Sequence, residues 1–328
     1  MLAGLIPERG RIELIDVDEP ELSPKGPKSP AGEIIFEPEL ACLCGSDLPF
    51  FDGDEHEYPI QVGQSLHEMI GRVVAQQGSQ YHPGDRVLVV PVEHLGLFER
   101  YTVDASRAVP FTSKPNDACA LLAQPLGTVI YALKKIPDLI DKDVVIVGQG
   151  PMGQLFNLAV RNLGARQIIG VDKCAARLET SKKVGATATI CNSTEDPIKR
   201  VAELTGGQMA DVVIEVVGHR DQALNLCIDL CRKFGRILFF GVPEPEINKV
   251  RWLDMFFKNI TIHTSVHPDF KRDFPLAMRW INEGRVDVSP LITHTYPLTE
   301  IQTAFEVFRD KKDGAQKVFV EFPAYHER

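Results

Sequence analysis

The N-terminal part of the chain alternates short apolar runs with turns rich in glycine and proline. The runs of apolar and β-branched residues that are long enough to be strands cover residues 11–17, 33–42, 69–75, 85–92 and 98–103. This pattern is typical of a mostly antiparallel barrel or sandwich, in which each strand buries one face. The sequence therefore predicts a β-rich domain at the start of the chain.

From about residue 127 the pattern changes to an alternation of helical and strand-like segments. The expected helices cover residues 128–136, 154–163, 175–184, 197–204 and 222–230. The expected strands cover residues 143–147, 167–171, 189–190, 212–216, 236–240 and 260–263. Strands that alternate with helices at this spacing form a parallel, doubly wound sheet, so the fold class is α/β.

The last 65 or so residues predict two amphipathic helices, at 275–283 and 300–309, and a closing strand at 317–321. They are too few to enclose a core of their own. We therefore expect three segments: a first domain over residues 1–126, a second over 127–264, and a return segment over 265–328 that completes the first domain. A length of 328 residues agrees with two domains.

Composition and charge exclude several classes of partner. Lysine and arginine number 36 against 45 aspartate and glutamate, which gives a formal net charge of −9. An acidic chain without a basic face is not expected to bind nucleic acid or an anionic membrane, and no stretch is apolar for long enough to span a bilayer. Seven scattered cysteines suggest reduced thiols, hence a cytoplasmic protein.

A glycine-rich motif follows the first strand of the predicted parallel sheet. The sequence after residues 143–147 is Gly148-Gln149-Gly150-Pro151-Met152-Gly153, which fits G-x-G-x-x-G at the start of a helix. The first glycine allows a tight turn, the second a close approach of a pyrophosphate, and the third close packing of helix on strand. The free N–H groups of the helix N-terminus attract the phosphates. This segment is therefore predicted to bind a dinucleotide.

An acidic residue at the end of the next strand indicates which dinucleotide. Asp172 follows the strand at 167–171 and lies where a carboxylate would bind the ribose hydroxyls. A carboxylate there repels a 2′-phosphate, so NAD is favoured over NADP. Arg177 and Lys173 lie close enough in sequence to weaken this preference without reversing it.

A second cluster has the residue types of a metal site. Cys44 lies in the sequence Cys-Gly-Ser-Asp, and His67-Glu68 comes 23 residues later, just before a strand. A thiolate and an imidazole are ordinary zinc ligands, and a catalytic site adds a third ligand and an open position. Either residue alone would more often be part of a core.

Taken together, these motifs resemble the medium-chain zinc-dependent alcohol dehydrogenases. The similarity includes CGSD, HE before a strand, HPGDRV, and the glycine motif with an acidic residue at the end of the next strand. It also includes DVVIEVVG at 211–218 and ITHTYPLTEIQTAFEVF at 292–308. It runs from about residue 10 to 322 and is closest to the polyol, sugar and threonine dehydrogenases. The family implies a GroES-like catalytic domain interrupted by a Rossmann domain, with zinc and a nicotinamide cofactor.

The resemblance also implies roles for individual residues. Cys44 and His67 match the catalytic zinc ligands, and Asp47 matches the carboxylate that orients a ligating histidine. Ser46 matches the hydroxyl that takes the proton of the alcohol. Glu68 matches a carboxylate that ligates in some members. Lys317 matches a cation that can pair with the cofactor pyrophosphate.

Three departures from the family pattern affect these expectations. At the third zinc position the family has Cys, Glu or Asp, whereas this chain has Gln124, so Gln124, Glu68 or water completes the shell. The lobe with four cysteines is missing between residues 90 and 101, so no structural zinc is expected. The loop 63–68 replaces the usual contiguous G-H-E, which alters the approach to His67.

The sequence therefore predicts a zinc-dependent oxidation of a secondary alcohol, of the polyol, sugar or cyclitol type, by NAD. A small-molecule alcohol is the expected partner, and the resemblance implies a homo-oligomer, a dimer or a tetramer. Two alternatives remain: a zinc-free NADPH-dependent enone or quinone reductase of the same fold, and a non-catalytic nucleotide-binding protein.

Overall fold

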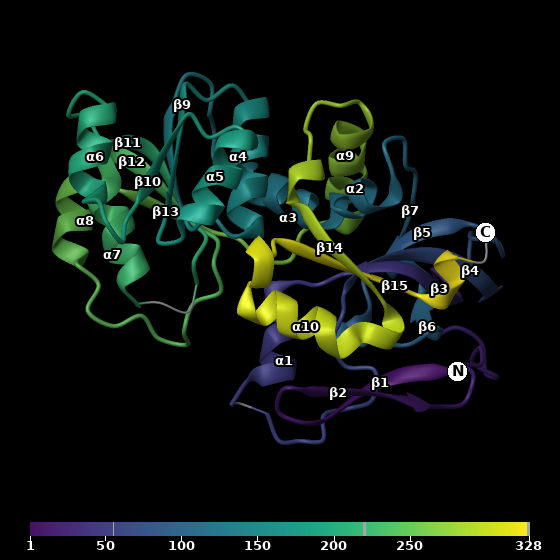
Figure 1. Cartoon of the computed structure of the whole chain (residues 1–328). Helices are drawn as coiled ribbons and strands as arrows, with labels where there is room; N and C mark the ends of the chain where they lie inside the picture. The colour runs from purple at the N-terminus through teal and green to yellow at the C-terminus, as the bar shows by residue number, and fades with distance from the viewer. Residues whose placement is uncertain (55, 219–220, 327–328) are drawn as a thin grey trace. The chain divides into compact units, whose positions relative to one another are not determined.

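The computed structural model describes residues 1–54, 56–218 and 221–326. The chain forms two compact units, each with its own core (Figure 1). The first unit contains residues 1–124 and the segment from residue 292 onward, and the second contains residues 125–291. In the described part of the chain, no helix combines the length and apolar character needed to cross a bilayer.

The first unit is built on a seven-stranded sheet with the path β14-β15-β3-β4-β5-β7, and β6 pairs with β3 beside this path. A separate antiparallel pair, β1 with β2, completes its strands. The strands are β1 (Leu2–Glu8), β2 (Arg11–Asp16), β3 (Glu33–Cys42), β4 (Glu68–Gln77), β5 (Arg86–Val89), β6 (Tyr101–Asp104), β7 (Ala108–Pro110), β14 (Ile292–Pro297) and β15 (Lys317–Glu321). Its helices are α1 (Leu48–Asp52), α2 (Asp117–Leu121) and α10 (Ile301–Asp310).

Strands from the C-terminal segment join this sheet beside β3. Strand β15 pairs antiparallel with β3, with Phe319 opposite Cys42. Strand β14 then pairs parallel with β15 at the sheet edge. Figure 1 shows these C-terminal strands and α10, in yellow-green, beside the purple and blue N-terminal strands. The register brings Lys317, at the start of β15, level with the end of β3, next to the loop that carries Cys44.

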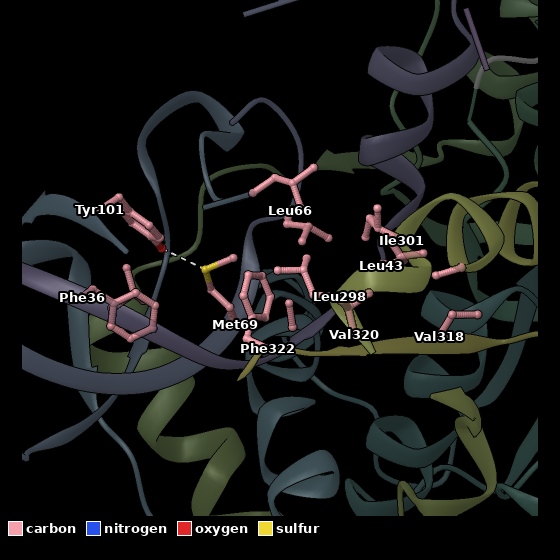
Figure 2. Packing of buried hydrophobic residues seen from close by; sticks show 14 of the residues in the cluster. Phe36, Leu43, Leu66, Met69, Tyr101, Leu298, Ile301, Val318, Val320 and Phe322 are labelled. Carbon is pink, nitrogen blue, oxygen red and sulfur yellow. Dashed lines mark hydrogen bonds between the residues drawn. The ribbon is translucent and has the colours of Figure 1, made fainter. Parts of the chain in front are cut away.

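The core of the first unit holds the two loops that carry the candidate metal ligands. Leu43 and Leu66 are both fully buried, and each directly precedes a candidate ligand. Figure 2 shows them packed with the side chains of Met69, Leu298 and Val320. Burying a leucine side chain stabilises a fold by about 1.5–3 kcal/mol. The core therefore fixes the backbone on both sides of the candidate metal centre.

The second unit is a six-stranded parallel sheet in the order β10-β9-β8-β11-β12-β13. The strands are β8 (Asp143–Val147), β9 (Gln167–Asp172), β10 (Ala188–Cys191), β11 (Ala210–Glu215), β12 (Cys231–Phe239) and β13 (Thr261–Thr264). The helices are α3 (Ala123–Leu133), which starts at the unit boundary, α4 (Pro151–Asn162), α5 (Ala175–Lys183), α6 (Pro197–Leu204), α7 (Asp221–Leu230), α8 (Trp252–Lys258) and α9 (Phe270–Asn282). Numbered within the sheet this is the order 3-2-1-4-5-6 of a doubly wound dinucleotide-binding fold, so the predicted α/β fold class is confirmed.

The segment 265–291 belongs to the second unit, whereas the sequence analysis placed it in the return segment. Its helix α9 packs on α3: Lys134 pairs with the fully buried carboxylate of Asp273 at 2.5 Å. Gly127 lies against Phe274 so closely that a Cβ there would come within 2.4 Å of the ring. The amphipathic pattern predicted the helix correctly but carried no information about which core its apolar face covers.

Candidate functional site

Cys44 lies in a short turn that follows strand β3. The chain leaves the sheet at Cys42, buries Leu43, and then forms a single 3₁₀ turn over Gly45–Asp47. The backbone N–H of Cys44 donates to the Asp47 carboxylate at 2.8 Å. This bond holds the turn closed and fixes the position of the Cys44 thiol, which is partly exposed.

His67 lies at the start of β4, after a turn with unusual backbone geometry. Ser65 and Leu66 both have positive φ, of 93° and 65°. Left-handed backbone is unfavourable for such residues and persists only where its surroundings impose it. Here the N–H of Leu66 donates to Asp47 Oδ1 at 2.9 Å, and Gly96 approaches the Leu66 carbonyl so closely that a Cβ would lie 2.4 Å from it.

Asp47 therefore joins the two loops. Its carboxylate is fully buried and lies 3.4 Å from His67 Nδ1, in addition to its two backbone bonds. Burial opposes its ionisation, but His67, His94 and the backbone N–H of Cys44 outweigh burial and lower the pKa of Asp47 below its usual range. Burial also lowers the pKa of His67, yet the adjacent Asp47 raises it well above normal overall. Asp47 thus lies next to His67 Nδ1, and the orienting role that the resemblance implies stays a prediction.

The candidate metal donors converge on one place. Ligand atoms of Cys44, His67 and Glu68 all lie within 4.8 Å of one another. One thiolate, one imidazole and one carboxylate are chemically suited to zinc. A second group, Asp47, His67 and His94, meets the same limit and shares His67. In the described part of the chain no further group of three such side chains lies this close.

Glu68 and Lys317 form a buried ion pair beside this group. Their side chains are 3% and 2% exposed, and Lys317 Nζ donates to Glu68 Oε2 at 2.5 Å and to the Leu43 carbonyl at 3.3 Å. Burial opposes the charged ammonium, but the Cys42 thiol and Glu68 raise the pKa of Lys317 above its usual range. The resemblance implied that Lys317 pairs with the cofactor pyrophosphate; in the structure its ammonium is enclosed and paired with Glu68 instead.

Gln124 and Ser46 lie close to the same loops. Gln124 is buried, and its Nε2 donates to the backbone carbonyl of His67 at 2.7 Å. Its amide nitrogen thus supports the backbone of a candidate ligand, and whether its oxygen binds a metal stays a prediction. Ser46 is exposed in the turn between Cys44 and Asp47, where its hydroxyl can reach solvent.

His94 is a residue of this cluster that sequence reasoning missed. Its ring lies 4.2 Å, centroid to centroid, from that of His67, and its Nδ1 lies 3.8 Å from Asp47 Oδ1. It is carried by the short segment after β5, between residues 90 and 101, where the family pattern implied a cysteine lobe that this chain lacks. A histidine in a segment that departs from the family pattern was the one sequence feature that could have indicated His94. Its contact with His67, however, depends on how two loops that are distant in sequence pair.

The glycine motif of the second unit has the geometry of a nucleotide cradle. Gly148 has a positive φ of 97°, and a Cβ on Gly153 would lie 2.0 Å from the Gly148 carbonyl, so both positions need glycine. A Cβ on Gly150 would meet only the Arg177 guanidinium, at 3.8 Å, which leaves this side of the turn open to a ligand. Helix α4 begins at Pro151, followed by Met152, and no side chain caps its first N–H groups. They are free to bind phosphate.

Asp172 ends β9 beside this cradle. Its carboxylate accepts hydrogen bonds from the N–H groups of Gln149, at 2.7 Å, and Cys174, at 2.8 Å. Arg177 lies 3.6 Å from the same carboxylate. The predicted cofactor residues Gly148, Gly150, Gly153, Asp172 and Arg177 are therefore brought together at the carboxyl edge of the sheet, where such folds bind nucleotides.

A buried polar network supports the cradle from behind and was not predicted. Gln149 is fully buried, and its Nε2 donates to the Ile146 carbonyl at 2.9 Å. Its Oε1 accepts from Asn157 at 2.7 Å and from the Ser181 hydroxyl at 2.8 Å. The network ties the turn to α4 and α5, so the turn is fixed without a ligand.

Comparisons with known proteins match both units of the chain. Residues 30–114 match the model of the alcohol dehydrogenase GroES-like domain, and residues 151–283 match that of the zinc-binding dehydrogenase domain. The L-threonine 3-dehydrogenase of Vibrio parahaemolyticus is 28% identical over 347 residues, covering 95% of this chain and 96% of its own.

Two solved structures share the fold along the chain. An alcohol dehydrogenase from Escherichia coli CFT073, in complex with NADH, is 24% identical with a TM-score of 0.85, covering 98% of this chain and 99% of its own. A zinc-binding dehydrogenase from Sinorhizobium meliloti 1021, bound to NADP, is 21% identical with a TM-score of 0.82, covering 98% of each chain. Similar folds thus hold either nucleotide.

Proposed function

The chain belongs to the medium-chain zinc-dependent dehydrogenase family, and we propose that it oxidises a secondary alcohol of the polyol, sugar or cyclitol type with one zinc ion and NAD. The observation that carries the proposal is the group formed by Cys44, His67 and Glu68, whose ligand atoms lie within 4.8 Å of one another. The nucleotide cradle of the second unit supplies the other requirement for hydride transfer, a place for the cofactor.

Cys44 and His67 would hold the zinc ion, with a third donor from the chain or from water. Bound zinc acts as a Lewis acid that makes a hydroxyl near it more acidic, and bound NAD accepts the hydride. The same donors argue against a zinc-free reductase, which has no use for a paired thiol and imidazole. Since the two donor groups in the described part of the chain share His67, they can hold only one ion between them, and we propose one zinc per chain.

The chain's own residues would orient the reactants and carry the proton. Asp47 holds His67 through Nδ1, which leaves the opposite ring nitrogen for the metal. Ser46 follows Cys44 directly and is exposed, so its hydroxyl can accept the substrate proton and pass it to water. The buried leucines before Cys44 and His67 limit backbone movement, so these two side chains keep their relative positions from one turnover to the next.

The choice of NAD rests on Asp172. The 2′-phosphate of NADP would bring negative charge against a carboxylate that is already held in place by two backbone N–H groups. Arg177, 3.6 Å from Asp172, partly offsets this charge. The ribose of NAD, with neutral hydroxyls, needs no such compensation, so NAD is the better partner.

The substrate class is proposed by analogy alone. The curated relative from Vibrio parahaemolyticus is named for L-threonine, which also carries a secondary alcohol. A site built around one metal and one hydroxyl suits any secondary alcohol, and the neighbours of that hydroxyl decide specificity. We therefore propose the class of reaction and test the substrate with a panel.

We also propose a homo-oligomer that buries helix α8. Trp252, Leu253, Phe256 and Phe257 of this helix are each 66% exposed. The neighbouring strand β13 pairs with β12 and is the last strand of its sheet. A contiguous apolar face beside an open strand edge is unfavourable in water and is typical of an interface.

We propose a cytoplasmic location on separate grounds. The seven cysteines are free, which supports a reducing, cytoplasmic environment.

The test is an assay of NADH formation with a panel of polyols, sugars, cyclitols and L-threonine. We expect turnover that is lost on chelation, restored by zinc, and nearly abolished in Cys44→Ser, while Cys227→Ser, at a buried position of the other unit, retains it. NADPH-dependent reduction of an enone by metal-free protein would instead assign the zinc-free reductase. Tight nucleotide binding without turnover of any substrate would assign the non-catalytic alternative.

A further inference from the structure

His94 is the one member of the metal cluster to which the family pattern assigns no role. It lies in the segment that replaces the cysteine lobe, with one ring nitrogen within 4.8 Å of ligand atoms of His67 and Asp47. Its ring contacts that of His67 on one side and that of Phe50, 5.5 Å away, on another. The imidazole is therefore held at the candidate metal centre.

The other candidates for a third donor either are held by other groups or offer a weak ligand atom. Glu68 is paired with Lys317, and moving its carboxylate to a metal would leave the buried ammonium of Lys317 without a counter-charge. The Nε2 of Gln124 is bonded to the carbonyl of His67, and an amide oxygen is in any case a weak zinc ligand. Both oxygens of Asp47 accept backbone N–H groups.

His94 is held less firmly, by a long ion-pair contact with Asp47. Its Nδ1 is buried and has no hydrogen-bond partner among the residues that the structure describes. The nearest carboxylate oxygen, of Asp47, is 3.8 Å away, which is beyond hydrogen-bond distance. Buried polar atoms nearly always have a partner, and an imidazole nitrogen without a hydrogen bond, beside a second imidazole and a carboxylate, points to a metal ion.

The backbone around His94 is shaped to hold it there. Glu93 and His94 both have positive φ, of 49° and 60°. The loop is tied to the one before His67 by the bridge between Ser65 and Leu95 and by the Gln64 amide, which donates to the Glu93 carbonyl at 2.5 Å. Two left-handed loops thus meet at the metal cluster, and conformations of this kind persist mainly at functional sites.

We propose that His94 is the third protein donor of the zinc ion, together with Cys44 and His67. This inference rests on the proposed zinc-dependent function and deepens it. Cys44 and His94 belong to different donor groups that share His67, so His94 has to turn towards Cys44 when zinc binds. Its side chain is 33% exposed, which leaves room for that turn. A thiolate and two neutral imidazoles give the centre a net charge of about +1 and replace the acidic ligand that Gln124 does not supply.

The experiment measures metal binding by the full chain after chelator dialysis. Zinc dissociation constants come from competition with a chromophoric chelator, and cobalt(II) spectra report the ligand set. The variants are His94→Ala, His94→Cys, which retains a donor, and the control His82→Ala, a histidine of the same unit whose side chain is 79% exposed. Thermal unfolding of each metal-free protein checks that it is folded.

We expect His94→Ala to weaken zinc binding by at least about tenfold and to shift the cobalt bands. In His94→Cys, which also serves if the alanine variant does not fold, zinc binding stays tight and a second thiolate-to-cobalt band appears. His82→Ala changes neither measurement.

Unchanged zinc affinity in His94→Ala, or weaker affinity without any change in the cobalt spectra of both variants, would overturn the assignment. In either case zinc binding by the unaltered chain leaves the proposed function in place. An unaltered chain that binds no zinc would overturn both the assignment of His94 and the proposed zinc-dependent function.

Discussion

Removing the charge of Lys317 should destabilise the first unit because it isolates a buried carboxylate. Glu68 is 3% exposed and receives its ion-pair bond from the Lys317 ammonium at 2.5 Å. In Lys317→Met the carboxylate keeps its burial and loses its counter-charge. Breaking a buried pair from one side costs about 3–5 kcal/mol. For folding units of about 150–250 residues this corresponds to a fall in Tm of roughly 6–20 °C.

The assay is thermal and urea unfolding of metal-free protein at neutral pH. Lys317→Met/Glu68→Gln should recover most of the stability, because neutral groups replace both charges. Lys182→Met serves as the control: its partner Glu179 is 66% exposed, and such surface pairs contribute about 0–1 kcal/mol. A Lys317→Met protein as stable as the control at neutral pH, or a double variant no better than the single one, would refute the reasoning.

Three further predictions concern the cofactor, the metal and the assembly. NADH should bind at least about tenfold more tightly than NADPH in a fluorescence titration, a difference of roughly 1.4 kcal/mol from the 2′-phosphate beside Asp172. Asp172→Ser should bring the dissociation constants of NADH and NADPH closer together. Equal constants in the unaltered chain would contradict a preference set by Asp172. Elemental analysis should find one zinc per chain, and two tightly held ions would show a second site that the donor groups do not include. Phe256→Glu should reduce the mass measured by light scattering if α8 is the interface, whereas Phe234→Glu, at a position 69% exposed on β12, should not.

The features predicted from sequence are those set by local patterns. The closing strand was expected at 317–321 and runs over Lys317–Glu321. The helix expected at 197–204 is α6, Pro197–Leu204. In both, hydrophobic periodicity and the neighbouring turn residues define the element without information from the rest of the chain. The glycine motif is similar, because its chemistry and its geometry lie within one turn.

Contacts between distant segments could not be predicted in this way. Lys317 and Glu68 are 249 positions apart, and pairing of β15 with β3 is what brings the ammonium next to the carboxylate. From sequence alone a lysine at the start of a strand was assigned to the cofactor. Helix α8 was missed for another reason: Trp252, Leu253, Phe256 and Phe257 lie on one face, but the helix has only seven residues, which is too short for periodicity to define an element.

The metal centre depends both on local sequence patterns and on contacts between distant segments. These contacts decide whether the fold needs the metal. Its residue types were evident in sequence, but its geometry comes from Asp47, which bonds the N–H of Cys44 and of Leu66 and so joins the two ligand loops directly. The buried Leu43 and Leu66 fix the same loops from the core side. Small zinc domains fold only with their metal because nothing else organises the ligands. Here hydrogen bonds and apolar packing organise them, so the first unit should keep its fold when the metal is removed, and metal affinity should report the donors rather than the stability of the fold.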